Sequence, residues 1–334
     1  MQAMVGGGRL PLFDAHCHLQ DPRIAHCMPH LLTAAVEAGV RWFAVNGTSE
    51  QDWDVVRKMG DTYPTVIPCF GLHPWYVANR SPSWFSTLQS KLEAVPTAAV
   101  GEVGLDKGSH CQTIDFETQV EVLKKQLQLA QTLQRPVAVH CVNAFGSLQD
   151  ILQEMGTFPA GIIMHSYSGP AEMVRMLAKY GAYFSFSGFF TSMKVEKAKQ
   201  VLLQVPLDRI LLETDAPDAF PRLDPSNLYW VPEDHASSSK GSGDNSNAED
   251  HAIEGLPNLN VQHNQAGGTE KISKSKVKAK IKSLSRRSVL NHPSNIYALL
   301  SYISSLLGTS EEELSHITFG NAMHLYSFSG SKVV

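Results

Sequence analysis

The hydrophobic pattern alternates along most of the chain between short apolar runs, rich in β-branched residues, and longer stretches with helical periodicity. The apolar runs have the length and composition of β-strands. They occupy residues 12–19, 41–48, 66–73, 98–106, 136–142, 161–166, 182–188 and 210–215. The pattern therefore predicts eight strands.

The clearest helical stretch is 116–133, where Val120, Leu123, Leu127 and Ala130 recur at spacings of three and four residues on one face. Strands that alternate with helices form parallel sheets, and eight such units close into a barrel. The predicted fold class is therefore α/β, a (β/α)8 TIM barrel over residues 12–328. The other predicted helices are 28–38, 52–59, 83–92, 148–153, 171–179, 194–203, 294–306 and 311–325.

One segment, residues 232–288, departs from the alternation. It is rich in Ser, Asn, Gly and Lys, acidic in its first part and basic in its second. Such a segment cannot bury enough apolar surface to offset its ordering entropy. We expect a disordered insertion that interrupts the barrel after strand eight. Its basic half is interpreted as a plain solvated linker, a nuclear localisation signal or a tether for DNA phosphates.

Composition narrows the class of protein. The formal net charge is −4, and outside the insertion there are 19 basic and 25 acidic residues. This balance argues against a protein whose whole surface binds nucleic acid. No apolar run reaches about 18 residues, and the N-terminal stretch has no apolar core of a signal peptide. Five cysteines without a C-x-x-C motif argue against a disulfide framework. We expect a cytoplasmic, or also nuclear, protein with no membrane contact and no obligate protein partner.

Residues with metal-binding chemistry stand where the predicted strands end, which is where barrels of this kind place their active sites. Strand one ends with His16 and His18, which alternation puts on one face with Cys17 on the other. Strand four carries a glutamate between glycines, a sign of close backbone approach. The full set at these strand ends is His16, His18, Glu102, His140, His165, Glu213 and Asp215.

Each of these residues has a plainer interpretation when taken alone. His140 alone would more often be a hydrogen-bonded core residue, Glu102 a salt-bridge partner, and Asp215 a turn residue before Ala-Pro. These interpretations would have to hold together on five strands at the same end, so we favour a metal site. Imidazole with carboxylate suits zinc, manganese, iron or nickel better than magnesium. Six ligands suit two ions that share a carboxylate and activate a water for hydrolysis. We expect two divalent ions, with zinc, manganese and magnesium all left open.

An ordered set of motifs resembles the signature of TatD-type metal-dependent deoxyribonucleases. The motifs are D-A-H-C-H-L at 14–19, G-L-H-P at 71–74, G-E-V-G-L-D at 101–106, H-x-Y-x-G at 165–169 and E-T-D-A-P at 213–217. N-H-P-S-N-I at 291–296 and G-N-A-x-x-L-Y at 320–326 are similar to later family motifs. The resemblance covers residues 12–230 and 289–328.

The resemblance implies an amidohydrolase-like barrel that cuts DNA phosphodiester bonds from a 3′ end. The net negative charge of the folded part favours single strands and 3′ ends as substrates over long duplexes. Asp215 would also take the proton of the attacking water, and Glu213 would lie deeper as a supporting partner. His73 would contact a phosphate or the leaving oxygen, or would simply cap the turn before Pro74. The implied ligands are His16, His18, Glu102 and Asp215 for one ion, and Glu102, His140 and His165 for the other.

Two positions depart from the family pattern. Val142 stands where the family usually has an arginine in H-x-R-D-A, and this loss of a phosphate clamp leaves the substrate open. Lys107 stands where an aromatic residue is usual, and it either contacts the substrate or is solvated. A metal-dependent amidohydrolase or esterase, acting for example on D-aminoacyl-tRNA, is the alternative. A non-catalytic binding module is disfavoured because every implied ligand position is occupied.

Overall fold

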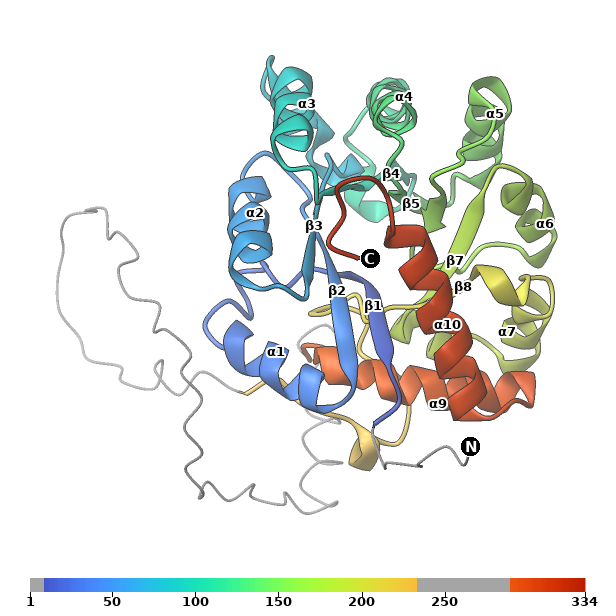
Figure 1. The fold of residues 1–334 in the computed structure, drawn as a ribbon. Coiled ribbons are helices and arrows are strands. Elements are labelled where there is room, and N and C mark those ends of the chain that lie inside the picture. The colour runs from blue at the N-terminus through green and yellow to red at the C-terminus, as the bar shows by residue number, and fades with distance from the viewer. Residues whose placement is uncertain (1–8, 233–288, 334) are drawn as a thin grey trace, which may run out of the picture.

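Eight parallel strands run in sequence order around a central barrel in the computed structural model, which describes residues 9–232 and 289–333 (Figure 1). Each strand pairs with the next one along the chain, so the predicted TIM barrel is confirmed. The strands are β1 Leu12–Cys17, β2 Val40–Asn46, β3 Val66–Phe70, β4 Ala99–Asp106, β5 Val137–Val142, β6 Ile162–Met164, β7 Ala182–Phe186 and β8 Ile210–Leu212.

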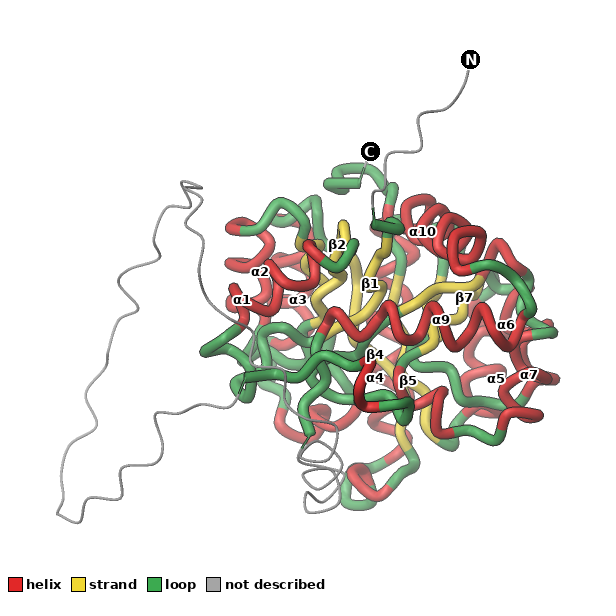
Figure 2. The backbone as a smooth tube through the Cα atoms, turned by 90° about the horizontal axis from the view of Figure 1, so that it is seen from below, coloured by secondary structure: helices red, strands yellow, loops and turns green. Residues whose placement is uncertain are grey.

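Helices surround the strands on the outside of the barrel, as Figure 1 shows, and Figure 2 shows them on both sides of the strands. They follow the predicted periodicity, with ends that differ by a few residues. The helices are α1 Met28–Glu37, α2 Trp53–Thr62, α3 Trp84–Ala94, α4 Phe116–Leu133, α5 Phe145–Met155, α6 Ala171–Lys179, α7 Val195–Leu202, α9 Ile296–Leu307 and α10 Glu311–Tyr326. Short 3-10 turns include η1 (Pro74–Asn79), η3 (Gly188–Ser192) and η7 (Pro293–Asn295). The expected insertion at 232–288 lies outside the described residues, apart from Pro232.

The seam between β8 and β1 is closed by hydrogen bonds at the carboxyl ends of both strands. The Asp215 amide donates to the His16 carbonyl (2.9 Å). The Asp14 carboxylate accepts from both the amide (2.8 Å) and the hydroxyl (2.5 Å) of Thr214. The closure therefore places the His-rich end of β1 directly beside the acidic end of β8.

Helix α10 fills the amino-terminal end of the barrel. The Tyr326 ring stacks on Phe13 with ring centroids 5.0 Å apart, and its hydroxyl donates to the Ala15 carbonyl (2.9 Å). Small and apolar side chains from the strands, among them Ala15, Ile67 and Ala138, complete this inner core. Because one end of the barrel is packed solid, only the opposite end is available for a site.

Six strands end two or three residues earlier than the hydrophobic pattern predicts, and β6 and β8 show a cause. We expected strands at 161–166 and 210–215, whereas β6 ends at Met164 and β8 at Leu212. Ser166 and Asp215 have left-handed backbone angles (φ 48° and 54°), which a parallel ladder does not accept. His165, Glu213 and Asp215 are nevertheless as buried as strand residues, and Ser166 is partly exposed, so burial alone does not mark the strand ends.

The five cysteines, all within the described part of the chain, are buried and form no disulfide bond. No helix among the described residues is both long and apolar enough to cross a membrane.

Asn291 holds the loop after β8 in place. Its side-chain amide donates to the carbonyls of Thr214 (2.8 Å) and Ala219 (3.3 Å), and its backbone amide donates to the Pro217 carbonyl (2.8 Å). The Asn291 side chain is fully buried. The segment that follows residue 288 therefore fixes the turn that carries Asp215.

We predict that Asn291→Ala lowers the free energy of unfolding by about 1–3 kcal/mol, because it leaves buried carbonyls without donors. Urea unfolding measures the change. Asn227→Ala, at an exposed asparagine of the same loop, is the control and should change stability by less than about 0.5 kcal/mol. Equal stability of Asn291→Ala and the wild type would contradict this role.

Candidate metal centre

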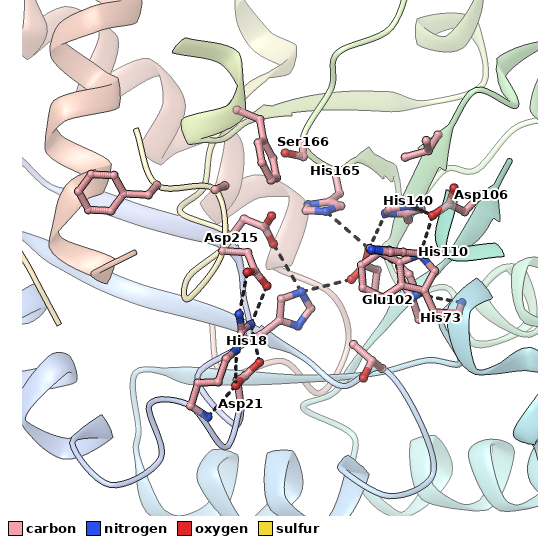
Figure 3. A pocket seen from close by; sticks show the side chains of 18 of the residues that line it. His18, Asp21, His73, Glu102, Asp106, His110, His140, His165, Ser166 and Asp215 are labelled. Atoms are coloured by element: carbon pink, nitrogen blue, oxygen red, sulfur yellow. Dashed lines mark hydrogen bonds and ion pairs between the residues drawn. The ribbon is translucent and has the colours of Figure 1, made fainter. Parts of the chain in front are cut away.

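The Glu102 carboxylate lies at the centre of a cluster of five imidazoles at the carboxyl end of the barrel, and Figure 3 shows it with four of them, those of His18, His73, His140 and His165. The side chain is only 2% exposed. Its two oxygens face different groups of rings. Oε2 lies 3.3 Å from Nε2 of both His16 and His18, whereas Oε1 lies 3.2 Å from His140 Nδ1, 3.4 Å from His73 Nε2 and 3.5 Å from His165 Nε2.

Glycines on either side of Glu102 allow β4 to lie this close to its neighbours. Gly101 and Gly104 have φ angles of 150° and 155°, which L side chains rarely adopt. A Cβ atom on Gly101 would sit 2.6 Å from Asn46 Oδ1, and one on Gly104 would overlap the His140 carbonyl. The glycines expected to permit close backbone approach are therefore required for it.

The electrostatic environment keeps Glu102 ionised. Burial alone would raise the pKa of its carboxyl, but the imidazoles of His73, His165 and His16 hold that pKa well below its usual range. Burial lowers the pKa of His16 to about 3, so this ring is neutral at pH 7. The centre thus combines an ionised carboxylate with a neutral imidazole, as metal ligation requires.

One group of donor atoms has the spacing of ligands around a single ion. His16 Nε2, His18 Nε2 and Glu102 Oε2 lie 3.2–3.3 Å from one another. Neighbouring ligands on a zinc-sized ion with bonds of about 2.0–2.1 Å are separated by a similar distance. Asp215 Oδ1 lies 3.5 Å from His18 Nε2, on the side of the cleft. These four residues fit a divalent cation.

Three rings have their outer nitrogen beside an oxygen that fixes the proton there. In the neutral form of each ring, the inner nitrogen therefore has its lone pair toward the centre, which is the tautomer of a metal ligand. His18 Nδ1 lies 2.8 Å from the Asn46 carbonyl, His165 Nδ1 lies 2.9 Å from Glu213 Oε1, and His140 Nε2 lies 3.3 Å from Asp106 Oδ2.

His73 has the opposite arrangement. Its Nδ1 accepts a hydrogen bond from the Trp75 amide (3.2 Å), so the neutral ring carries its proton on Nε2, which faces Glu102. Burial lowers the pKa of His73 to about 4, which keeps the ring neutral. His73 therefore offers the centre a proton donor rather than a lone pair.

The structure brings all six sequence-predicted ligands together. Donor atoms within 4.8 Å of one another form three clusters, His16 with His18 and Asp215, His73 with Glu102 and His140, and His16 with His165 and Glu213. His165 thus groups with His16 and Glu213, although its Nε2 also faces Glu102. Glu213 is completely buried behind His165, where it also accepts from the Ser166 amide (2.8 Å).

Lys107 lies apart from this group. Its ammonium is 3.9 Å from the centroid of the Phe116 ring and 3.4 Å from the Ser147 hydroxyl. Lys107 is not among the residues that line the cleft above the centre. Its expected contact with the substrate therefore has no support in the geometry.

Sequence reasoning missed Asp106 as a site residue. Its carboxylate lies beside His140 and accepts from the indole N–H of Trp75 (2.5 Å) and the Gly108 amide (2.6 Å). Strand alternation contained the signal, because Asp106 lies four residues after Glu102 on β4 and so shares its face. Asp106 holds the His140 ring in the orientation that directs Nδ1 inward.

A cleft with a volume of about 1450 Å³ opens above the centre. Arg23 spans part of its rim, because its guanidinium donates to the carboxylates of both Asp21 and Asp218. Val142 also lines the cleft, at the position where the resemblance implies an arginine.

The fold and the site define a metal-dependent hydrolase built on a TIM barrel. A profile of the family described as "TatD related DNase" matches residues 13–327, so the chain belongs to that family.

Individual relatives agree with this assignment. The chain is 30% identical over 231 residues to "Uncharacterized metal-dependent hydrolase YabD" of Bacillus subtilis (strain 168), covering 66% of this chain and 89% of that protein. It is 26% identical over 216 residues to "3'-5' ssDNA/RNA exonuclease TatD" of Escherichia coli (strain K12), covering 63% and 81%. The crystal structure of the TatD homologue YJJV from Escherichia coli K12 has a TM-score of 0.70 at 22% identity, over 95% and 98% of the two chains, and so shares the fold.

We predict that Asp106→Asn weakens the binding of Zn²⁺ or Mn²⁺ by about 10- to 100-fold, because the neutral amide no longer fixes the proton on His140 Nε2. Isothermal titration of the metal-free protein measures the affinity. Asp61→Asn, at a side chain that is 70% exposed on α2, is the control and should bind metal like the wild type. Unchanged affinity in Asp106→Asn would rule out this supporting role.

Proposed function

We propose that this protein is a two-metal phosphodiesterase that removes nucleotides from the 3′ end of single-stranded DNA. The observation that carries the proposal is the division of the imidazoles between the two oxygens of Glu102. A carboxylate that faces two groups of ligands is the arrangement by which two-metal hydrolases hold their ions close together. The name of the Escherichia coli relative, a 3′–5′ ssDNA/RNA exonuclease, supports the substrate and the polarity.

We assign the ligands in two sets that share Glu102. Bound divalent ions supply Lewis acidity, which lowers the pKa of a water molecule and neutralises charge on a phosphate. The imidazole-rich donor set favours zinc or manganese over magnesium. The first set is His16, His18, Glu102 and Asp215, and the second is Glu102, His140 and His165.

Asp215 is the residue that we expect to take the proton of the attacking water. Its carboxylate reaches the first ligand group and also lines the cleft, so it meets both the centre and the substrate. The left-handed turn that aims it there is held by the bond from its own amide to His16 and by the Asp218 amide, which donates to the Asp215 carbonyl (2.8 Å). A general base must stand within hydrogen-bond reach of the proton it removes.

Glu213 and His73 complete the proposed machinery. Glu213 keeps the proton of His165 on Nδ1 and so orients that ring from behind. His73 lines the cleft with a protonated Nε2, so it is suited to donate a hydrogen bond to a phosphoryl oxygen or to the leaving oxygen. A neutral donor of this kind stabilises charge that develops on oxygen during cleavage.

Val142 favours one alternative substrate class. Without a family arginine at this position, the cleft lacks a fixed phosphate clamp on β5. An ester or amide substrate, such as a D-aminoacyl-tRNA, would use the same centre. The cytoplasmic or nuclear location and the role of the 232–288 segment stay predictions.

We predict that metal-free protein supplied with Mn²⁺, Zn²⁺ or Mg²⁺ shortens a single-stranded oligonucleotide from its 3′ end. Products of a 5′-labelled strand, resolved by length, show the polarity. Asp215→Asn should lower the rate by about 10²- to 10⁴-fold, because the amide cannot accept a proton.

Asp208→Asn, at a side chain that is 75% exposed and distant from the cleft, is the matched control and should cleave like the wild type. Circular dichroism confirms that both variants fold. Full activity of Asp215→Asn would refute the role given to this residue. Metal binding without cleavage of any oligonucleotide would refute the nuclease proposal and favour the ester or amide substrate.

A further inference from the structure

Trp75 is an exposed aromatic side chain at the edge of the proposed metal centre. It belongs to η1, two residues after His73, and lines the cleft with 41% of its surface exposed. An indole is among the largest apolar surfaces a side chain has, so a flat ligand that covers its open face removes much apolar area from water. The position beside the centre makes the substrate the candidate.

The Trp75 ring is held in a fixed orientation. Its N–H donates to the Asp106 carboxylate (2.5 Å), which anchors one edge of the indole. The nearby imidazoles of His73 and His110 stand nearly perpendicular to it, at interplanar angles of 82° and 75°. No aromatic ring in the described part of the chain lies parallel on the indole. A rigid ring of this kind can stack on a flat partner with little loss of conformational entropy.

The distance to the centre suits a nucleotide. The Trp75 ring centroid lies 6.3 Å from that of His140, one of the proposed ligands, and both residues contact the same Asp106 carboxylate. A phosphate held at the centre carries its sugar and base outward into the cleft, on the scale of one nucleotide. Stacking on aromatic side chains is the usual way in which proteins bind single-stranded nucleic acid without reading its sequence.

Phe189, the most exposed aromatic residue that lines the cleft, is a competing candidate. It lies in η3, also lines the cleft and is 53% exposed. Its ring has no polar atom that a hydrogen bond could anchor. The anchored ring is the better platform, because its orientation exists before the substrate arrives.

We propose that Trp75 is the stacking platform for an unpaired nucleobase next to the scissile phosphate. This inference rests on the proposed function and adds to it a reason for single-stranded substrates. A base inside a duplex already stacks on its neighbours and pairs with its partner, so it cannot offer its face to the indole without leaving the helix. The platform accepts any base but requires that a base be present.

The test compares oligonucleotides that differ only in one missing base. Three single strands are used, one normal, one abasic at the 3′-terminal nucleotide and one abasic at the penultimate nucleotide. For the wild type, kcat/KM should fall roughly 5- to 150-fold when the base at one of these two positions is removed. In Trp75→Ala this penalty should shrink to about 1- to 2-fold, and Trp75→Phe should keep part of it.

The ratio of kcat/KM for the normal strand to kcat/KM for the abasic strand separates the effect of stacking from that of the hydrogen bond to Asp106. Trp75→Ala removes that bond as well and so slows both substrates, but an equal loss cancels in the ratio. Tyr297→Ala removes an aromatic ring of similar exposure (42%) that does not line the cleft, and it should keep the wild-type ratio.

Three results would overturn the inference. The wild type could cleave normal and abasic strands equally, Trp75→Ala could keep the full penalty, or Phe189→Ala could abolish the penalty while Trp75→Ala does not. Failure of the wild type to cleave any strand with any of the three metals would instead overturn the proposed function, and this inference with it.

Discussion

The arrangement of this site depends on the burial of one ionised carboxylate, that of Glu102. An ionised side chain as enclosed as Glu102 is costly to remove from water unless opposite charges or donors surround it. Five imidazoles do so here, and they approach its two oxygens from two sides. Glycines in β4 make room for this approach, and the β8–β1 seam brings Asp215 to the same point. The packed amino-terminal end of the barrel leaves the carboxyl end free to hold the cluster.

Hydrogen bonds behind the rings decide what each imidazole can do. Asn46, Asp106 and Glu213 lie beside the outer nitrogens of three histidines, so that in the neutral rings the lone pairs face inward. The Trp75 amide does the reverse to His73, whose proton faces the centre. The cluster therefore holds two chemically different kinds of histidine. The proposed metal ligands and the proposed hydrogen-bond donor, His73, differ in which ring nitrogen carries the proton. Asp106 is connected to both kinds of histidine. It contacts His140 directly, and it accepts from the indole of Trp75, whose backbone amide donates to His73.

Sequence patterns were sufficient for the barrel and for the set of residues that converge in it. Eight apolar runs alternating with helices specify the fold, and polar residues at strand ends stand out because that position is otherwise apolar or turn-like. The turns at Ser166 and Asp215 escaped prediction because a left-handed backbone angle at a residue other than glycine leaves no signal in the hydrophobic pattern. The contact of Lys107 with the Phe116 ring joins residues nine apart in the chain and leaves no pattern in the sequence. The clamp from Asn291 to the β8 loop joins residues that the sequence separates by more than seventy positions.

The shared role of Glu102 is tested most directly by the number of ions that the protein binds. Titration of metal-free protein with Zn²⁺ or Mn²⁺, followed by calorimetry, should give two ions per chain for the wild type. Glu102→Gln, checked for folding by circular dichroism, should lose at least one of the two, because an amide cannot serve as an anionic ligand to both. Binding of two ions by Glu102→Gln with wild-type affinity would contradict the account.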